Sequence, residues 1–107
     1  MIENKDKFDL NKPNNNGQTP FLLACENGHT EIAKLMIENN DKIDLNKPNE
    51  NEASPFFTSC AKGHLEIVKL MIESGKIDLN KEDNRGTTPF LSACRFGHLR
   101  FSHRTLS

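Results

Sequence analysis

Three cysteine–histidine pairs are the residues of this chain whose types and spacing could do chemistry. In each pair three residues separate the thiol from the imidazole, and the pairs are Cys25 with His29, Cys60 with His64, and Cys94 with His98. Thiolate and imidazole are zinc ligands, and an imidazole beside a thiol can also activate it as a nucleophile. The spacing therefore raises two hypotheses, a metal site and a nucleophilic pair.

Both hypotheses fail on the surroundings of the pairs. Two ligands in each pair fall short of the four that a structural zinc site needs, and a glycine before each histidine takes it off the helix face. No third group is placed to orient the histidine. We therefore interpret the cysteines as small buried residues and the histidines as loop residues satisfied by backbone groups. The chain is predicted to have no catalytic residue, no bound metal and no cofactor, with Cys94 the most reactive thiol because its unit is the least covered.

The pairs belong to a longer pattern that recurs every 34 to 35 residues. A Thr/Ser-Pro-Phe sequence precedes each cysteine, and a Gly-His sequence follows it. The three copies begin at Thr19, Ser54 and Thr88. A fixed period of this length is typical of a solenoid, in which each unit buries its apolar face only against its neighbours.

Each unit is predicted to contain two short helices and an extended loop. Thr19, Ser54 and Thr88 are suited to cap the first helix, the following proline fits its first position, and the glycine before the histidine ends it. A second helix is expected to begin near Thr30 and Leu65. Its apolar stripe is Ile32, Leu35 and Met36 in one unit and Ile67, Leu70 and Met71 in the next. Leu10 and Leu45 in the loops are expected to tuck between units.

Composition narrows the classes of function. The chain has 107 residues, a formal net charge of −1 and three cysteines, with neither Trp nor Tyr. No global field attracts nucleic acid or an anionic membrane, and no long apolar run spans a bilayer. Cysteines in neighbouring units lie roughly 10 Å apart, too far for a disulfide. Reduced thiols and an N-terminus without a signal-peptide pattern favour a cytoplasmic or nuclear location.

The recurring residues resemble the ankyrin repeat over nearly the whole chain. The matching sequence in the first unit is Gly17-Gln18-Thr19-Pro20, Ala24-Cys25, Gly28-His29 and Ile32-Ala33-Lys34-Leu35-Met36-Ile37. The resemblance implies an all-α solenoid of stacked antiparallel helix pairs with extended finger loops. It also implies recognition of another protein, with no nucleic acid, membrane or small-molecule substrate and no chemistry of its own.

The chain departs from the ankyrin pattern in two places. Phe-Leu or Phe-Phe stands where the family has Leu-His after Thr-Pro, so apolar bulk replaces a polar residue in each first helix. Glu52 stands where the first and third units have Gly17 and Gly86, so the second finger is expected to be irregular.

The repeats divide residues 1–107 into one array. Its parts are a tail of a preceding partial repeat (1–13), repeat 1 (14–48), repeat 2 (49–82) and a divergent repeat 3 (83–107). Met1-Ile2-Glu3-Asn4 aligns with Met36-Ile37-Glu38-Asn39, which predicts a short partial helix near Met1. Ser102, Arg104 and Thr105 occupy inner slots, so the last residues are expected to be the least ordered. Both a capping unit and a piece of a longer array fit these ends.

Two functional hypotheses follow. One is a scaffold or adaptor that binds a partner through the concave face of the stack; the other is a non-binding structural fragment of a longer ankyrin-repeat protein, with any catalytic domain outside this chain. The resemblance implies contact positions at the finger tips and before Gly-His. These positions are Asn15, Asn16, Gln18, Glu26, Asn27, Glu50, Asn51, Ala53, Ala61, Lys62, Asn84, Arg85, Thr87, Arg95 and Phe96. Phe96 is either an interface hot spot or a patch over the last helix.

Overall fold

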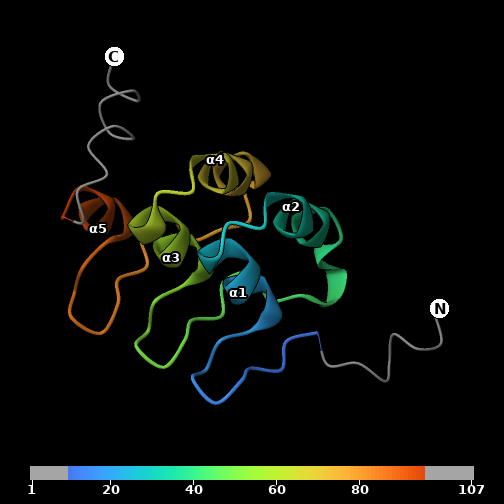
Figure 1. The fold of residues 1–107 in the computed structure, drawn as a ribbon, viewed down its shortest axis with the longest axis horizontal. Coiled ribbons are helices and arrows are strands. Elements are labelled where there is room, and N and C mark those ends of the chain that lie inside the picture. The colour runs from blue at the N-terminus through green and yellow to red at the C-terminus, as the bar shows by residue number, and fades with distance from the viewer. Residues whose placement is uncertain (1–9, 96–107) are drawn as a thin grey trace.

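The structure is a computed structural model that describes residues 10–95, and within this part of the chain it is helical with no strand (Figure 1). The helices are α1 (Pro20–Glu26), α2 (Thr30–Glu38), α3 (Pro55–Lys62), α4 (Leu65–Ser74) and α5 (Pro89–Arg95), with a short 3-10 helix η2 (Asn40–Lys42). Helices α1, α3 and α5 form a first row, in which α3 packs between α1 and α5. Helices α2 and α4 pack beside each other as a second row. The predicted all-α stack of helix pairs is confirmed.

The first helix of each unit begins as its sequence predicts. The side-chain oxygens of Thr19, Ser54 and Thr88 accept hydrogen bonds from backbone N–H groups three residues later, at 3.1, 3.1 and 3.2 Å. Each cap satisfies a donor that the first turn leaves without a helical partner. At the other end of α3, Gly63 takes the left-handed conformation with φ +74°. The Thr/Ser-Pro period therefore sets the spacing of the first row.

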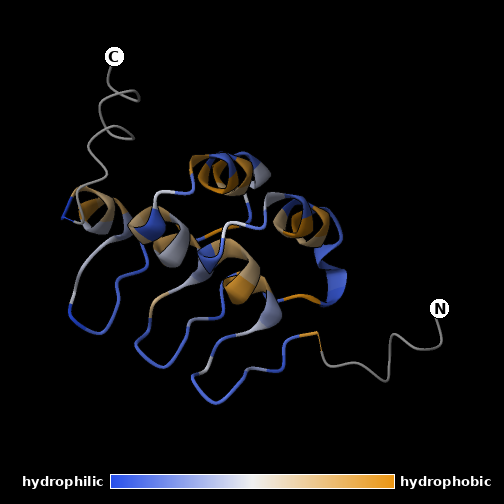
Figure 2. Cartoon of the chain, in the orientation of Figure 1, coloured by the Kyte–Doolittle hydropathy of each residue, from blue (hydrophilic) through white to orange (hydrophobic). Residues whose placement is uncertain are grey.

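One hydrophobic core runs through both rows of helices. Phe21 and Phe56 are fully buried in the first row, and Ile67 and Met71 are fully buried in the second. Leu45, from the loop between the rows, is also buried, as predicted. Figure 2 shows the apolar residues on the helices and the polar residues on the projecting loops. Since helices of this length are marginal alone, packing between units holds them.

Each finger loop is closed by one asparagine or aspartate side chain. The Oδ1 atoms of Asn14, Asn49 and Asp83 each accept hydrogen bonds from two backbone N–H groups, those two and four residues later, at 2.9–3.1 Å. Neighbouring fingers are joined by backbone bonds from Glu50 N to Asn16 O (3.3 Å) and from Asn84 N to Asn51 O (2.9 Å). The fingers therefore form one connected edge.

The second finger is regular, so the expectation from Glu52 is wrong. Glu52 N donates to Asn49 O at 3.0 Å, as Gly17 N donates to Asn14 O in the first finger. Glu52 adopts φ +65°, close to the values of +77° and +80° at Gly17 and Gly86. The Asn49 side chain holds the turn, and the Glu52 carboxylate forms an ion pair with Lys81 at 3.1 Å. The side chain therefore leaves strain at Glu52 and does not change the turn.

Replacing Glu52 by glycine is expected to stabilise the chain. A left-handed L-residue carries about 1–2 kcal/mol of strain, whereas glycine costs about 0.5–1 kcal/mol in chain entropy and the exposed ion pair contributes about 0–1 kcal/mol. The central values leave a net gain of about 0.3 kcal/mol, so we expect the melting midpoint of Glu52→Gly to rise by about 1–2 °C. Glu50→Gly, in the same finger but without a positive φ, should lower it; a fall of equal size in both variants would contradict the prediction.

Asparagines in the extended loops connect successive units. The side chain of Asn46 donates to Lys76 O at 3.1 Å and accepts from Asp78 N at 2.9 Å. One unit earlier, Asn11 makes the same two bonds to the backbone of Lys42 and Asp44, at 2.9 and 2.7 Å. The loops were expected to be extended, and these bridges show that they also fix the spacing between units.

The apolar stripe predicted for α2 is only partly buried. Ile32 and Leu35 are 52% and 58% exposed, and the buried residues of α2 are Ala33 and Ile37. The counterpart of Ile32 in the next unit is Ile67, which is fully buried. Helix α4 has α2 beside it, whereas the corresponding side of α2 faces away from α4. The predicted burial of the apolar stripe is therefore confirmed for α4, whose Ile67 and Met71 are buried beside α2, and not for Ile32 and Leu35 of α2.

The predicted partial helix near Met1 and the predicted loss of order at the C-terminus lie outside the described residues.

Candidate functional site

The cysteine–histidine pairs are divided between the core and the surface. Cys25 and Cys60 are fully buried, as expected, whereas Cys94 is exposed, so its predicted burial is wrong. Cys25 lies on α1 and Cys60 on α3, and both helices pack against helices of the first and the second row. Cys94 lies on α5, the last described helix. His98 lies outside the described residues. In residues 10–95, no group of three or more His, Cys, Asp or Glu side chains is placed to hold a metal ion.

Burial makes the two inner thiols poor nucleophiles. Desolvation raises the pKa of Cys25 to about 12, although a hydrogen bond with Ser59 opposes the rise, and desolvation raises the pKa of Cys60 to about 12. At neutral pH both therefore remain thiols, which neither attack a substrate nor bind zinc readily. Their environment is that of small apolar residues in a core.

The histidine of the second unit binds the unit before it. His64 Nε2 lies 2.8 Å from the carbonyl oxygen of Glu26, at the end of α1. The ring rests against Gly28, where a Cβ atom would lie 2.8 Å from His64 Cε1. His64 is satisfied by a backbone group, as predicted. The contact holds the C-terminal end of α1 against the unit that contains α3, and thereby positions Glu26.

A shallow hollow of about 360 Å³ lies between α1 and α3. Its lining is mainly apolar and consists of Glu26, Ala53, Phe57, Thr58, Ala61 and Lys62. Phe57, Thr58 and Ala53 are buried and form its floor, whereas Lys62 is exposed and Glu26 is half-buried. The Glu26 carboxylate is held by Gln18, whose Nε2 donates to Oε1 at 2.8 Å. An anion and a cation therefore flank an apolar floor.

A second hollow, of about 440 Å³, lies between the second and third finger tips. It is polar and is lined by Asn51, Asp83, Asn84 and Arg85. Burial alone would raise the pKa of Asp83, but backbone N–H groups of Thr87 and Arg85 and the charge of Arg85 hold it below its ordinary value. Arg85 Nε lies 3.6 Å from Asp83 Oδ2, while the Arg85 side chain remains 70% exposed. The hollow thus presents a cation and amide groups to solvent.

The structure brings many of the predicted contact positions to these two hollows, but not all. Two of the implied contact positions are buried, since Ala53 and Thr87 are only 7% and 5% exposed. Ala53 is reachable only as part of a hollow's floor, and Thr87 is held between Asp83 and Arg95. Gln18, Glu26 and Ala61 are half-buried. The exposed positions are Asn15, Asn16, Asn27, Glu50, Asn51, Lys62, Asn84, Arg85 and Arg95. Phe96 lies outside the described residues.

Phe57 and Thr58 are site residues that sequence reasoning missed. They line the hollow between α1 and α3, but neither was among the expected contact positions. The available signal was Phe57 itself, because the other units have Leu22 and Leu91 in its slot. A second aromatic residue in one unit alone departs from the repeat and indicates a local role.

None of the helices in the described part of the chain is long and apolar enough to cross a membrane.

A protein-family model described as ankyrin repeats (3 copies) matches residues 1–83 and 39–102 of the chain. None of the curated proteins compared with the chain matches it significantly. The family match therefore stands on the repeat pattern, which spans the described helices and fingers.

Proposed function

We propose, from the premise that the chain belongs to the ankyrin repeat family, that it binds another protein through the hollow between α1 and α3 and the adjoining finger tips. Ankyrin repeats are generally protein–protein interaction modules. The role that we propose for this chain is that of a scaffold or adaptor. We also propose that it has no catalytic activity and that it acts in the cytoplasm or nucleus.

One observation carries the proposal: Glu26, Ala53, Ala61 and Lys62 line a single apolar hollow. The resemblance to ankyrin repeats implies them as contact positions, and they come from three different segments of the chain. An apolar depression with a few flanking charges is the usual form of a binding pocket. The hollow is shallow and lies open to solvent, so a protruding side chain of another protein fits it better than an enclosed small molecule.

The flanking charges indicate the chemistry of the partner. Glu26 stands on the α1 side of the hollow and Lys62 on the α3 side. Arg85 adds a second cation at the finger tips. We expect a segment that inserts an aliphatic side chain over Phe57, with a basic residue towards Glu26 and an acidic residue towards Lys62 and Arg85. Such charges steer encounter and select orientation more than they add affinity.

Selection of peptides that bind the folded chain, followed by substitution in the hollow, tests the proposal. Ala61→Arg places a long charged side chain over the floor and is expected to weaken a selected peptide at least about tenfold, equivalent to about 1.4 kcal/mol. The matched control is Glu66→Arg, at an exposed position of α4 outside the hollow. Both variants should melt like the unmodified chain.

Binding that survives Ala61→Arg, or that falls equally in both variants, would rule out the hollow as the site. If no peptide depends on the hollow, the alternative of a structural fragment of a longer ankyrin-repeat protein gains support.

A further inference from the structure

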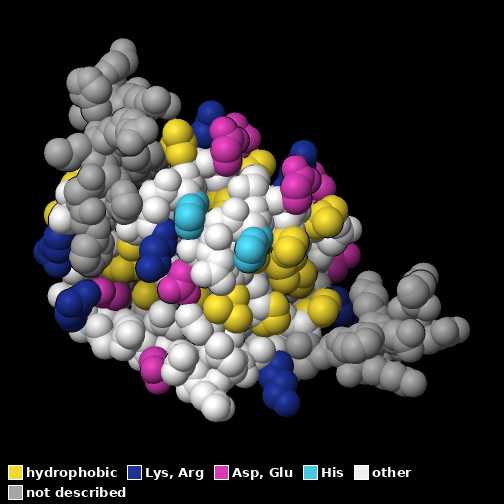
Figure 3. Space-filling model, in the orientation of Figure 1, with side chains coloured by type: hydrophobic (Ala, Val, Ile, Leu, Met, Phe, Trp, Pro, Cys, Tyr) yellow, Lys and Arg dark blue, Asp and Glu magenta, His cyan; other side chains and the backbone are white. Residues whose placement is uncertain are grey.

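The connection between α1 and α2 contains an Asn27-Gly28 sequence, whose two residues can react with each other. Because glycine has no Cβ atom, its backbone nitrogen can approach the side-chain carboxamide of a preceding asparagine with little hindrance. Asn27 is exposed. The connection lies on the face drawn in Figure 3, where histidine side chains are visible at the surface. Water therefore reaches this asparagine in the folded chain.

Neither of the two groups that would react here is held by a hydrogen bond. Within residues 10–95, no group accepts a hydrogen bond from Gly28 N–H, and the Asn27 side chain has no hydrogen-bond partner. Asn27 follows the last residue of α1 and has ψ 1°. A rotation about this bond brings its carboxamide to the Gly28 nitrogen and opens the hydrogen bond from His29 N–H to Ala24 O, which is 2.9 Å long. Such a local opening at a helix end requires no unfolding of the core.

We propose that Asn27 is a site of spontaneous covalent modification, at which it deamidates through a cyclic imide. The Gly28 nitrogen attacks Cγ of Asn27, so an N–Cγ bond forms and the bond between Cγ and Nδ2 breaks. The side-chain nitrogen leaves as ammonia, with the proton that Gly28 loses. Water then opens the imide at either of its two carbonyl groups. One opening gives aspartate, and the other gives isoaspartate, in which the main chain runs through Cβ and Cγ.

Both products weaken the contact between the first and second units. Each places a carboxylate at the C-terminal end of α1, next to Glu26, where the helix dipole disfavours negative charge. Isoaspartate also adds one carbon atom to the main chain before Gly28, which rests against the His64 ring. The hydrogen bond between His64 Nε2 and Glu26 O, at 2.8 Å, lies at the same place. This chemistry belongs to the chain alone and does not depend on a partner.

A second asparagine–glycine sequence in the chain is held more firmly. Asn16-Gly17 lies in the first finger, where Gly17 N–H donates to Asn14 O at 3.0 Å. Asn16 O also accepts a hydrogen bond from Glu50 N–H, at 3.3 Å. The nitrogen that would attack is therefore engaged, and we expect Asn16 to deamidate more slowly than Asn27.

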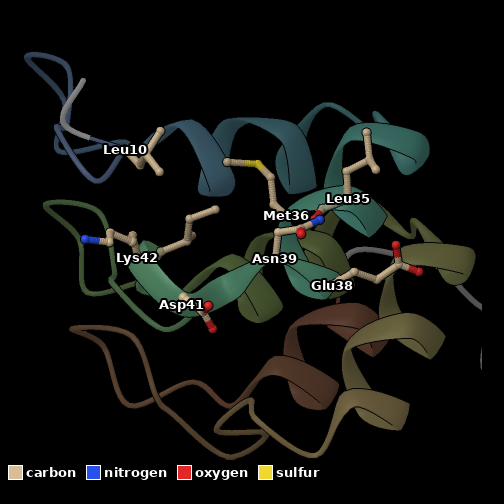
Figure 4. A pocket seen from close by; sticks show the side chains of 8 residues that line it. Leu10, Leu35, Met36, Glu38, Asn39, Asp41 and Lys42 are labelled. Carbon is tan, nitrogen blue, oxygen red and sulfur yellow. The ribbon is translucent and has the colours of Figure 1, made fainter. Parts of the chain in front are cut away.

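Asn39 is a control at an equivalent place of another helix. It follows α2 as Asn27 follows α1, and it lines a hollow with Leu35 and Met36 (Figure 4). Its Nδ2 atom donates to Leu35 O at 2.9 Å, and the next residue is Asn40 and not glycine. Both features disfavour the imide, so Asn39 should remain unmodified.

Peptide mass spectrometry of the folded chain, aged at mildly alkaline pH, measures the loss of amide at each asparagine. Asn27 is expected to deamidate about fivefold faster than Asn16, equivalent to about 1 kcal/mol for the additional hydrogen bond of Gly17. In concentrated guanidinium chloride the two should react alike, because both precede glycine. The aged chain should melt at a lower temperature, whereas Asn27→Gln aged in the same way should keep its midpoint.

The proposal is overturned if Asn16 reacts as fast as Asn27 in the folded chain, or if Asn27 reacts no faster than Asn39. An equal fall of the midpoint in aged Asn27→Gln would show that modification of Asn27 does not weaken the contact between units.

Discussion

Alkylation of the folded chain at about pH 8 is expected to modify Cys94 and to leave Cys25 and Cys60 intact until the chain unfolds. Cys25 and Cys60 are fully buried, and burial raises both pKa values from the ordinary 9.0 to about 12. Since the thiolate is the reactive form, this lowers the reactive fraction of the inner thiols about a thousandfold. Exclusion of the reagent from the core lowers their rates further, whereas Cys94 is exposed.

Peptide mass spectrometry after timed reaction with iodoacetamide measures the three rates separately. In concentrated guanidinium chloride all three cysteines should react alike, because the burial that separates them is lost. Cys94→Ser should abolish modification of the folded chain without changing its melting. Reaction of Cys25 or Cys60 at the rate of Cys94 in the folded state would show that the first row opens far more readily than its packing implies.

Features that depend on a few neighbouring residues could be predicted from the sequence. The caps at Thr19, Ser54 and Thr88 formed where expected, because a side-chain oxygen beside a proline acts within one turn of backbone. The left-handed Gly63 and the starts of α2 and α4 were also found where expected, because each depends on residues within about one turn of backbone. Agreement of these local signals over three units also identified the family.

Features that depend on what lies beside a unit could not be predicted from the repeat alone. Ile32 and Ile67 occupy the same slot, yet one is 52% exposed and the other fully buried. Cys60 and Cys94 differ in the same way. In a stack each unit is covered by its neighbours, so equal slots in different units have unequal surroundings. The sequence pattern describes the slot, and burial depends on the position in the array.

The second finger shows the reverse case, in which a unit departs from the repeat in sequence but keeps the same structure. Glu52 was expected to disturb its turn, but the Asn49 side chain binds two backbone N–H groups and keeps the conformation of the other fingers. The asparagine or aspartate in the slot of Asn14, Asn49 and Asp83 was visible in the sequence. The sequence does not show how strongly this side chain stabilises the turn. In the structure its hydrogen bonds together outweigh the strain of one left-handed residue. The burial of Ala53 and Thr87 could not be predicted for the same reason, because both residues belong to these side-chain-closed turns.

Replacing Phe56 by alanine is expected to lower the free energy of unfolding by about 3–5 kcal/mol, a large part of the roughly 5–15 kcal/mol that is typical of a domain. Phe56 is fully buried on α3, which packs against α1, α4 and α5. Its ring lies 5.7 Å from that of Phe90 at an interplanar angle of 77°, an edge-to-face contact across two units. The variant loses this contact and leaves a cavity among three helices, so it should unfold at a much lower urea concentration than the unmodified chain.

Phe90→Ala is the matched control, because it removes the same ring type from the equivalent slot of α5. Phe90 is 44% exposed, so its removal forfeits the aromatic contact and only part of the apolar burial, about 1–2 kcal/mol. Urea unfolding followed by far-ultraviolet circular dichroism measures both losses. A cost at Phe90 equal to that at Phe56 would mean that the last described unit is covered as fully as the central one. A much smaller cost places the main stabilising contacts of the array around α3, next to the hollow proposed to bind the partner.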